Sequence, residues 1–274
     1  LLVMKNHKLL EKEFQADGIK INWHNMGTSP QAARAMSSGS LDIAGNMNTA
    51  ALLMLNSEGL PVRVVTGTAH PTSNFAIVSK PGTELSVKDL KGKQVVGPKG
   101  TFLHQLLVAA LEKEGMNESD VQFINMGIPK ALSTILAGHA DAALVASSAL
   151  IKANKAGAKT IINAEGLVEP TLVMTTTKQF AEEHPDIVKR VGKVYAESLR
   201  WMEEHPSETA EMGAQEHGIS VEDAKTLMER SHYFEKMTSK DLEDLKVNQK
   251  FLRDNGMMRN ELSVEELVLP VAMK

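Results

Sequence analysis

The chain has 274 residues, enough for one large or two modest domains, and its 23% charged and 42% hydrophobic residues exclude a disordered or fibrous chain. Thirty Lys and Arg residues against 34 Asp and Glu residues give a net charge of −4, so a nucleic-acid partner has little electrostatic support. The absence of cysteine excludes disulfides and thiolate chemistry, and the longest apolar stretch, residues 50–55, is far too short to span a membrane.

Strands and helices are predicted to alternate through the first 177 residues. The chain opens at Leu1 in helix-like sequence without a Met, so we expect a first strand, and with it a targeting segment, upstream. The predicted strands are residues 19–23, 42–45, 62–67, 74–79, 94–97, 121–125, 159–163 and 167–177. The predicted helices are residues 32–38, 49–58 and 101–114, and from residue 178 helix signals stand alone. This order predicts an α/β fold with mostly parallel sheets flanked by helices and a helical C-terminal tail.

An internal sequence repeat indicates two similar lobes. Three pairs of residues share one offset of 99: Pro30 and Pro129, Gly39 and Gly138, Asp42 and Asp141. In each half the pattern predicts a strand, a helix begun by Pro and closed by Gly, and a second strand, although chance spacing of Gly and Pro is the alternative. The two aspartates fall at strand starts, so we expect structural roles for them.

The position of the helical tail suggests how the lobes are divided. The strand at residues 167–177 looks like a return crossing, after which the tail packs on the first lobe. We therefore expect lobe 1 to comprise residues 1–81 and 172–274, and lobe 2 to comprise residues 82–171. Hinges are expected near residues 80–84 and 168–173.

Five loops are candidates for binding a ligand. In parallel sheets, ligands gather where strands end and helices begin, because helix N-termini present unpaired N–H groups. The loops that meet this rule are residues 28–31, 46–49, 99–102, 145–148 and 169–171. Their short hydroxyl and amide side chains suit a small anionic or strongly polar ligand, whereas the plainer reading of each is helix capping. His104, in the first turn of a helix, and His70, before Pro71, are further candidates.

The sequence lacks the motifs that would indicate a nucleotide site, a metal site or a nucleophilic serine. Residues 97–101 contain glycines, a lysine and a threonine but lack the spacing of a phosphate-binding loop, and the nine histidines form no metal-binding motif. No GxSxG elbow is present for a nucleophilic serine. We therefore expect no catalytic residues, no metal and no cofactor.

The order of these motifs resembles the nitrate, sulfonate and taurine class of substrate-binding proteins of ABC importers. The resemblance is carried in the first half by residues 7–14, Ser29-Pro30-Gln31, residues 39–43 and residues 46–49. It continues in residues 89–96, Lys99-Gly100-Thr101 and residues 138–142. It implies a two-lobed periplasmic-binding-protein-like fold of type II, a periplasmic or membrane-tethered location outside the cytoplasm, and a permease as partner. Such a receptor is expected to be a monomer that closes its hinges on the ligand.

The resemblance also implies which residues contact the ligand. Carried over position by position, and with His104 added from its place on the helix, they are Ser29, Gln31, Asn46, Asn48, Thr49, Gly100, Thr101, Phe102, His104, Ser147, Ser148, Pro170 and Thr171.

The ligand class is left open between several alternatives. Sulfonate binders of this class commonly show Trp-Asp-Pro after the second-lobe strand, where this chain has Val145-Ala146-Ser147-Ser148, so an alkanesulfonate is in doubt. A small organic or inorganic anion is the first hypothesis. The alternatives are a binding protein or an enzyme for a thiamine-pyrimidine-like cofactor precursor on the same scaffold, and a sensory domain of a larger protein.

Overall fold

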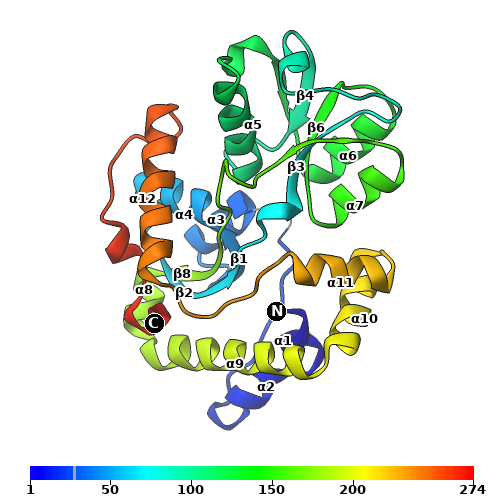
Figure 1. Ribbon diagram of the computed structural model, residues 1–274. Helices are drawn as coiled ribbons and strands as arrows, with labels where there is room; N and C mark the ends of the chain where they lie inside the picture. Colours follow the sequence, from blue (N-terminus) through cyan, green and yellow to red (C-terminus); the bar gives the residue numbers. More distant parts are fainter. Residues whose placement is uncertain (27–28) are drawn as a thin grey trace. The chain divides into compact units, whose positions relative to one another are not determined.

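The computed structural model describes residues 1–26 and 29–274, and the chain folds into two compact units (Figure 1). Unit 1 comprises Leu1–His70, Thr171–Lys225 and His232–Lys274, and unit 2 comprises Pro71–Pro170 and Thr226–Ser231. The fold is α/β, as expected. Residues 71–81, which the sequence predicts in the first lobe, lie in unit 2, because the strand they contain pairs with two strands of that unit.

Unit 1 is built on a three-stranded sheet in the order β1-β8-β2. The strands are β1 (Ile43–Asn48), β8 (Leu172–Thr177) and β2 (Val62–Ala69), and both pairings are antiparallel. The expectation of a mostly parallel sheet is wrong here. β1 and β2 do run in the same direction, but the return strand β8 lies between them and pairs antiparallel with both.

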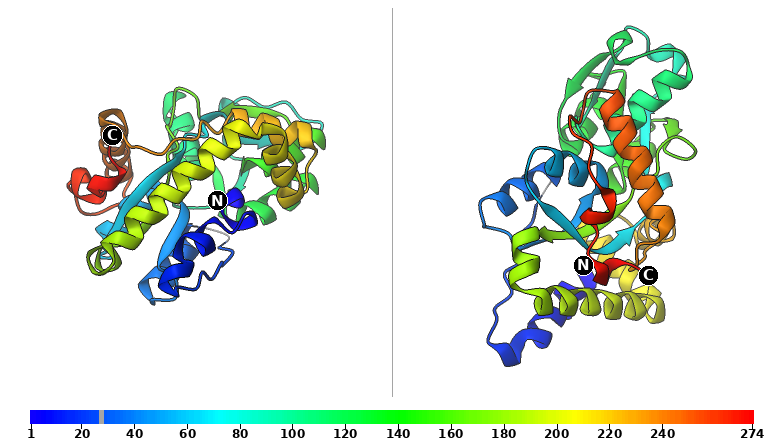
Figure 2. Two further views of the ribbon diagram at one scale, coloured as in Figure 1. Left: turned by 90° about the horizontal axis from the view of Figure 1, so that it is seen from below. Right: turned by 90° about the vertical axis from the view of Figure 1, so that its left-hand side faces the viewer.

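One face of this sheet is covered by helices from the two ends of the sequence. The long helix α9 (Pro185–Glu204) packs beside α1 (Leu2–Asn6) and α2 (Leu9–Phe14), as Figures 1 and 2 show. Its residues Val188, Val191 and Tyr195 recur at helical spacing and are buried with Val65 of β2 and Met174 of β8. This cluster forms the core of unit 1 and fixes β8 in the middle of the sheet.

Further helices frame this sheet and form the tail. They are α3 (Ser29–Ser37), α4 (Thr49–Ser57), α8 (Lys178–Glu183), α10 (Pro206–His217), α11 (Val221–Glu229) and α12 (Ser239–Asp254). The division between the units falls within α11, after Lys225. Pro185 and Pro206 begin their helices, because proline fixes a helical φ and needs no N–H partner in the first turn. The predicted strand at residues 19–23 is wrong, since these residues lie in irregular structure between η1 (Gln15–Asp17) and α3.

Unit 2 is built on a five-stranded mixed sheet. Its order is β5 (Gln122–Asn125), β4 (Gln94–Gly97), β6 (Ala142–Ala146), β3 (Phe75–Ser79) and β7 (Thr160–Asn163). β4 is parallel to both β5 and β6, as expected for strands joined by helical crossovers. β3 pairs antiparallel with β6 and β7, so the prediction of a parallel sheet holds for only half of the pairings.

Alternate residues of the central strands of unit 2 face two different helical layers. Ile77 and Leu144 pack against α5 (Phe102–Lys113) on one face of the sheet. Val78 and Val145 pack on the other face against α6 (Ile128–Leu136) and α7 (Ser148–Lys155). This is the period-2 alternation of a strand that is buried on both sides.

The repeat of 99 residues is real at the level of elements. Both α3 (Ser29–Ser37) and α6 (Ile128–Leu136) have nine residues and begin 99 positions apart, and both are followed by a glycine with positive φ, at +70° for Gly39 and +76° for Gly138. Among the residues that the structure describes, a preceding strand is found in the second copy, as β5, and not in the first.

Short 3-10 turns complete the chain: η2 (Thr72–Asn74), η3 (Lys88–Leu90), η4 (Glu118–Asp120), η5 (Val264–Leu267) and η6 (Pro270–Ala272). Among the described residues, no helix is both long enough and apolar enough to cross a bilayer.

Candidate functional site

The starts of α3 and α4 meet in unit 1, where two of the predicted site residues join them. Ser29 opens α3, and Asn48 is the N-cap of α4 at the end of β1. The Asn48 Nδ2 amide donates to Ser29 Oγ at 3.0 Å, and the Asn48 backbone N–H donates to the same oxygen at 3.3 Å. Asn48 Oδ1 accepts from the Ala51 N–H at 2.8 Å. Within the described residues, Ser29 Oγ therefore accepts two bonds and keeps its own O–H hydrogen to donate.

Asn46 and Gln31 flank this junction. Asn46 is exposed in β1, and its Oδ1 accepts from Thr68 Oγ1 at 2.9 Å. Thr68 lies on β2, where its carbonyl accepts from the Tyr195 hydroxyl at 3.0 Å. Burial raises the pKa of Tyr195, so this hydroxyl stays a neutral donor. Gln31 is exposed in the first turn of α3, while Gly27 and Thr28 of the same predicted loop lie outside the described residues.

Thr49 and Thr171 support the junction from within. Thr49 is 1% exposed and Thr171 is 4% exposed, so neither hydroxyl faces solvent. The Thr49 backbone N–H donates to the Thr171 carbonyl at 3.0 Å. The two threonines therefore support the predicted contact residues from the protein interior. Their backbone hydrogen bond holds the first residue of α4 next to the residue that precedes β8.

In unit 2, the start of α5 presents free backbone donors. Thr101 is the N-cap of α5, but its Oγ1 donates to the Pro98 carbonyl at 3.0 Å instead of accepting from the helix. The first N–H that is bonded within the helix belongs to Gln105. Gly100 has a φ of +69°, a backbone conformation that other residues rarely adopt, and Phe102 is 1% exposed in the core. This loop can therefore bind a ligand through its backbone N–H groups and through the positive end of the α5 dipole.

His104 is a supporting residue and not a surface donor, contrary to expectation. Its side chain is 1% exposed and stacks on Phe123 with ring centroids 4.9 Å apart. Nδ1 accepts from the Gly100 N–H at 3.3 Å, so Nε2 carries the proton and donates to Glu118 at 3.1 Å. Burial lowers the pKa of His104, and Glu118 opposes that shift in part. Hydrophobic stacking draws the ring inward, which sequence alone could not reveal.

The start of α7 carries the strongest backbone strain near the predicted site. Ser147 follows β6 with a φ of 52° and a ψ of −126°, a region that costs a non-glycine residue about 1–3 kcal/mol. Its N–H donates to the Asn74 carbonyl at 2.8 Å, and its hydroxyl has no partner among the described residues. Ser148 begins α7 and is partly exposed, whereas Pro170 is buried and ends the segment of unit 2 that leads to Thr171.

Lys99 lies in the predicted loop at residues 99–102 but is not among the contacts that the resemblance implies. It is exposed beside Gly100, and within the described part of the chain its ammonium has no ion pair. Thr68 escaped the sequence analysis altogether: it lies on β2 and donates to Asn46 across the sheet. Pairing between distant strands placed it there, so no local signal could have found it.

A groove of unit 1 lies away from the predicted site residues. It has a volume of about 600 Å³ along α12 and is lined by Lys246, Gln249, Lys250, Arg253, Asp254, Met258, Arg259 and Glu261. Lys250 pairs with Asp254, and Arg253 pairs with Glu261, so much of its charge is already compensated. None of the predicted site residues lines it. In the described part of the chain, no three His, Asp or Glu side chains are grouped to hold a metal.

Comparison with known proteins places these features in a family. A family model described as NMT1/THI5 like matches residues 13–209. The taurine-binding periplasmic protein of Escherichia coli is 29% identical over 180 residues, which is 64% of this chain and 55% of that protein. A Bacillus subtilis relative whose name refers to aliphatic sulfonate binding is 27% identical over 217 residues, which is 77% of this chain and 64% of that protein.

The fold agrees with solved structures. The periplasmic aliphatic sulphonate binding protein SsuA of Escherichia coli superposes with a TM-score of 0.85 at 18% identity, covering 100% of this chain and 89% of that one. This likeness confirms the expected two-lobed fold class. The chain spans 44% to 64% of the length of the curated relatives that it matches.

Proposed function

Because this chain belongs to the NMT1/THI5-like family, we propose that it is the solute-binding receptor of an ABC importer for a small sulfonate or a similarly compact anion. The names of its curated relatives, which refer to taurine and to aliphatic sulfonates, support this proposal. The same names support a periplasmic or otherwise extracytoplasmic location and an importer permease as partner. The relatives are binding proteins, so the ligand is expected to be released unchanged, by a receptor that acts as a monomer.

The observation that carries the proposal is the Ser29–Asn48 junction. Both lone pairs of Ser29 Oγ are taken by Asn48, which leaves the O–H hydrogen as a donor between the starts of two helices. Helix N-termini favour negative charge, and neutral donors can hold an oxyanion without a buried cation to desolvate. A sulfonate group has three oxygens that need such donors.

We assign a second half-site to unit 2. It consists of the backbone N–H groups at the start of α5, the hydroxyl of Ser147, which has no partner among the described residues, and the exposed ammonium of Lys99. Each of these groups can donate to an oxyanion. The chain crossings at His70–Pro71 and Pro170–Thr171 are the proposed hinges. Nitrate would satisfy the same donors, so the anion's size and tail must be settled by experiment.

Titration calorimetry with taurine, 1-butanesulfonate, nitrate and a thiamine-type aminopyrimidine tests the proposal. We expect heat with at least one of the anions. Asn48→Asp should then weaken binding by at least tenfold, because it places a negative charge at the junction while its oxygen can still cap α4.

Asn117→Asp is the matched control, since Asn117 caps η4 in the same way and is exposed. It should leave affinity unchanged. Heat with the pyrimidine alone, or equal affinity of Asn48→Asp and the wild type for the anion, would reject the proposed function.

A further inference from the structure

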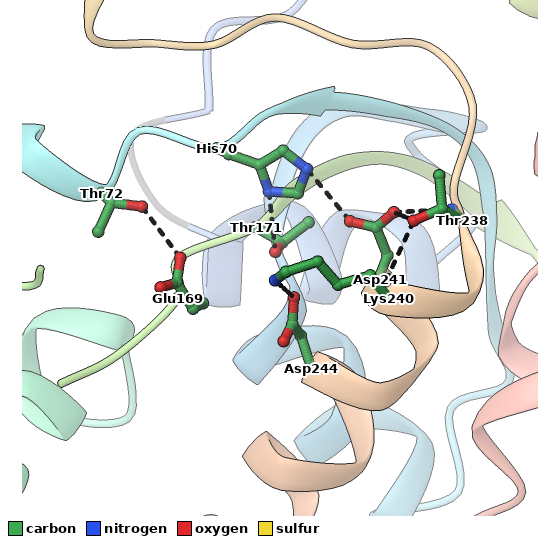
Figure 3. A network of polar contacts seen from close by, with 8 residues as sticks. All are labelled: His70, Thr72, Glu169, Thr171, Thr238, Lys240, Asp241 and Asp244. Atoms are coloured by element: carbon green, nitrogen blue, oxygen red, sulfur yellow. Dashed lines mark hydrogen bonds and ion pairs between the residues drawn. The ribbon is translucent and has the colours of Figure 1, made fainter. Parts of the chain in front are cut away.

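Three of the points where the chain passes between the two units meet at one histidine. His70 is the last residue of unit 1 before the first crossing, Thr171 is the first residue after the return, and His232 is the first after the last crossing. The His70 backbone N–H donates to the His232 carbonyl at 3.3 Å. Nδ1 of the same residue lies 3.3 Å from Thr171 Oγ1, as Figure 3 shows. All of these contacts lie within unit 1.

The other side of the His70 ring is held by a buried carboxylate. Nε2 lies 3.1 Å from Asp241 Oδ1, and the Asp241 side chain is 6% exposed (Figure 3). Asp241 Oδ2 accepts from the Thr238 N–H at 2.7 Å and from Thr238 Oγ1 at 2.6 Å, in the capping box of α12. Although burial opposes it, bonding to His70 and Thr238 lowers the pKa of Asp241 to about 2. Asp241 is therefore an acceptor, so Nε2 donates, and in the neutral ring Nδ1 accepts from the Thr171 hydroxyl.

The face of the ring is fixed as well. Phe234 stacks on His70 with ring centroids 4.1 Å apart and planes 13° apart. Phe234 also lies over Gly67 of β2 so closely that a Cβ there would be 2.0 Å from the ring. With both nitrogens bonded and one face stacked, the imidazole has a single orientation, although its side chain is 31% exposed.

A short path leads from this histidine to the Ser29–Asn48 junction. Thr171, which receives the His70 contact, accepts the Thr49 N–H through its carbonyl at 3.0 Å. Thr49 is the first residue of α4 and directly follows Asn48. The orientation of His70 thus bears on the position of the helix start that is proposed to hold the anion.

We propose that His70, oriented by Asp241, is a positioning residue that fixes the entry of β8 at Thr171 and, through it, the start of α4. The inference rests on the proposed function for its effect on affinity, but the effect on α4 itself is independent of any ligand. His70 and Asp241 act through Thr171 and need no contact with the anion.

Substitutions of His70 can separate the roles of its two ring nitrogens. His70→Asn keeps a polar atom near the position of Nδ1, toward Thr171, and loses the contact with Asp241, whereas His70→Ala loses both. We expect His70→Ala to speed exchange of the Thr49 amide hydrogen and to weaken taurine or 1-butanesulfonate binding by about tenfold, the equivalent of one or two buried hydrogen bonds. His70→Asn should recover most of both properties.

Asp241→Asn and His139→Ala complete the set. Asp241→Asn can retain the capping oxygen but removes the charge that orients His70, so it should give an intermediate effect in both measurements. His139 is exposed in unit 2, and His139→Ala should change neither.

The two proposals fail in different ways. If the wild type binds no anion, the proposed function is wrong, while Thr49 exchange still tests the positioning role. Thr49 exchange in His70→Ala within twofold of the wild type would overturn the inference. So would equal behaviour of His70→Asn and His70→Ala. If His70→Ala does not fold, His70→Asn and Asp241→Asn decide between the same outcomes.

Discussion

At the scale of single residues, burial decides what a polar side chain can do. Asn48 and His104 both stand at helix starts, and the sequence marks both as candidate contacts. Asn48 remains partly exposed and bonds to Ser29, whereas His104 is enclosed by Phe123 and Glu118. Capping is local chemistry and can be predicted from the sequence. The inward turn of His104 depends on residues more than ten positions away, so it cannot.

The buried histidine predicts a pH effect on stability. Burial lowers the folded-state pKa of His104 below its ordinary 6.5, so the unfolded chain takes up a proton more readily than the folded one. Its contribution to stability is complete above about pH 6.5 and is lost as pH falls toward the lowered folded pKa. His104→Asn cannot titrate, and its oxygen can still accept from the Gly100 N–H.

Urea unfolding at pH 7.5, 6.5 and 5.5 measures this difference. The free energy of unfolding should fall less steeply with acidification in His104→Asn than in the wild type, whatever their absolute stabilities. Other titrating groups are common to both chains and cancel in the comparison. Parallel slopes would show that His104 does not bind its proton more weakly in the folded state.

At the scale of elements, local signals predicted helices better than sheet order. Gly and Pro marked the limits of α6, α9 and α10, and the apolar run of β4 was placed correctly at residues 94–97. The insertion of β8 between β1 and β2 joins residues more than a hundred positions apart. It is driven by burial against α9, and no pattern within β8 records it. For the same reason the sequence could not place Thr68 beside Asn46.

Replacing a glycine by alanine is expected to have opposite effects on stability in β2 and in α9. In β2, a Cβ on Gly67 would lie 2.0 Å from Phe234, so Gly67→Ala must displace that ring and should destabilise the protein by about 1–3 kcal/mol. In α9, a Cβ on Gly192 would lie 4.0 Å from the Val65 carbonyl oxygen. Gly192→Ala should therefore stabilise by about 0.5–1 kcal/mol through helix propensity.

Urea midpoints of the two variants provide the test, and their opposite signs control for any general effect of alanine. A destabilised Gly192→Ala would mean that α9 has no room for a methyl group. An unchanged Gly67→Ala would mean that Phe234 moves aside freely, which would also weaken the case that it fixes the His70 ring.

At the scale of the whole molecule, the repeat of 99 residues gives each unit a helix start that belongs to one of the proposed half-sites. In each copy a nine-residue helix leads through a glycine into a strand, and a second helix begins where that strand ends. The starts of α4 and α7 are thus equivalent, and they carry Asn48 and Ser147. The two copies differ in capping: Asn48 caps its helix, while Ser147 leaves its hydroxyl without a partner among the described residues.

If each half-site binds the anion, its amide hydrogens must exchange more slowly in the bound state. Hydrogen exchange with and without saturating taurine, or the anion that calorimetry selects, should slow in the first turns of α3 and α4 and also in the first turn of α5. The last group is informative, because the N–H groups of residues 102–104 precede the first intrahelical bond, so a bound anion can become their acceptor. The C-terminal turn of α12, which carries none of the proposed contacts, serves as the internal reference. Protection confined to unit 1 would remove α5 and Ser147 from the site and leave the Ser29–Asn48 junction to hold the anion alone.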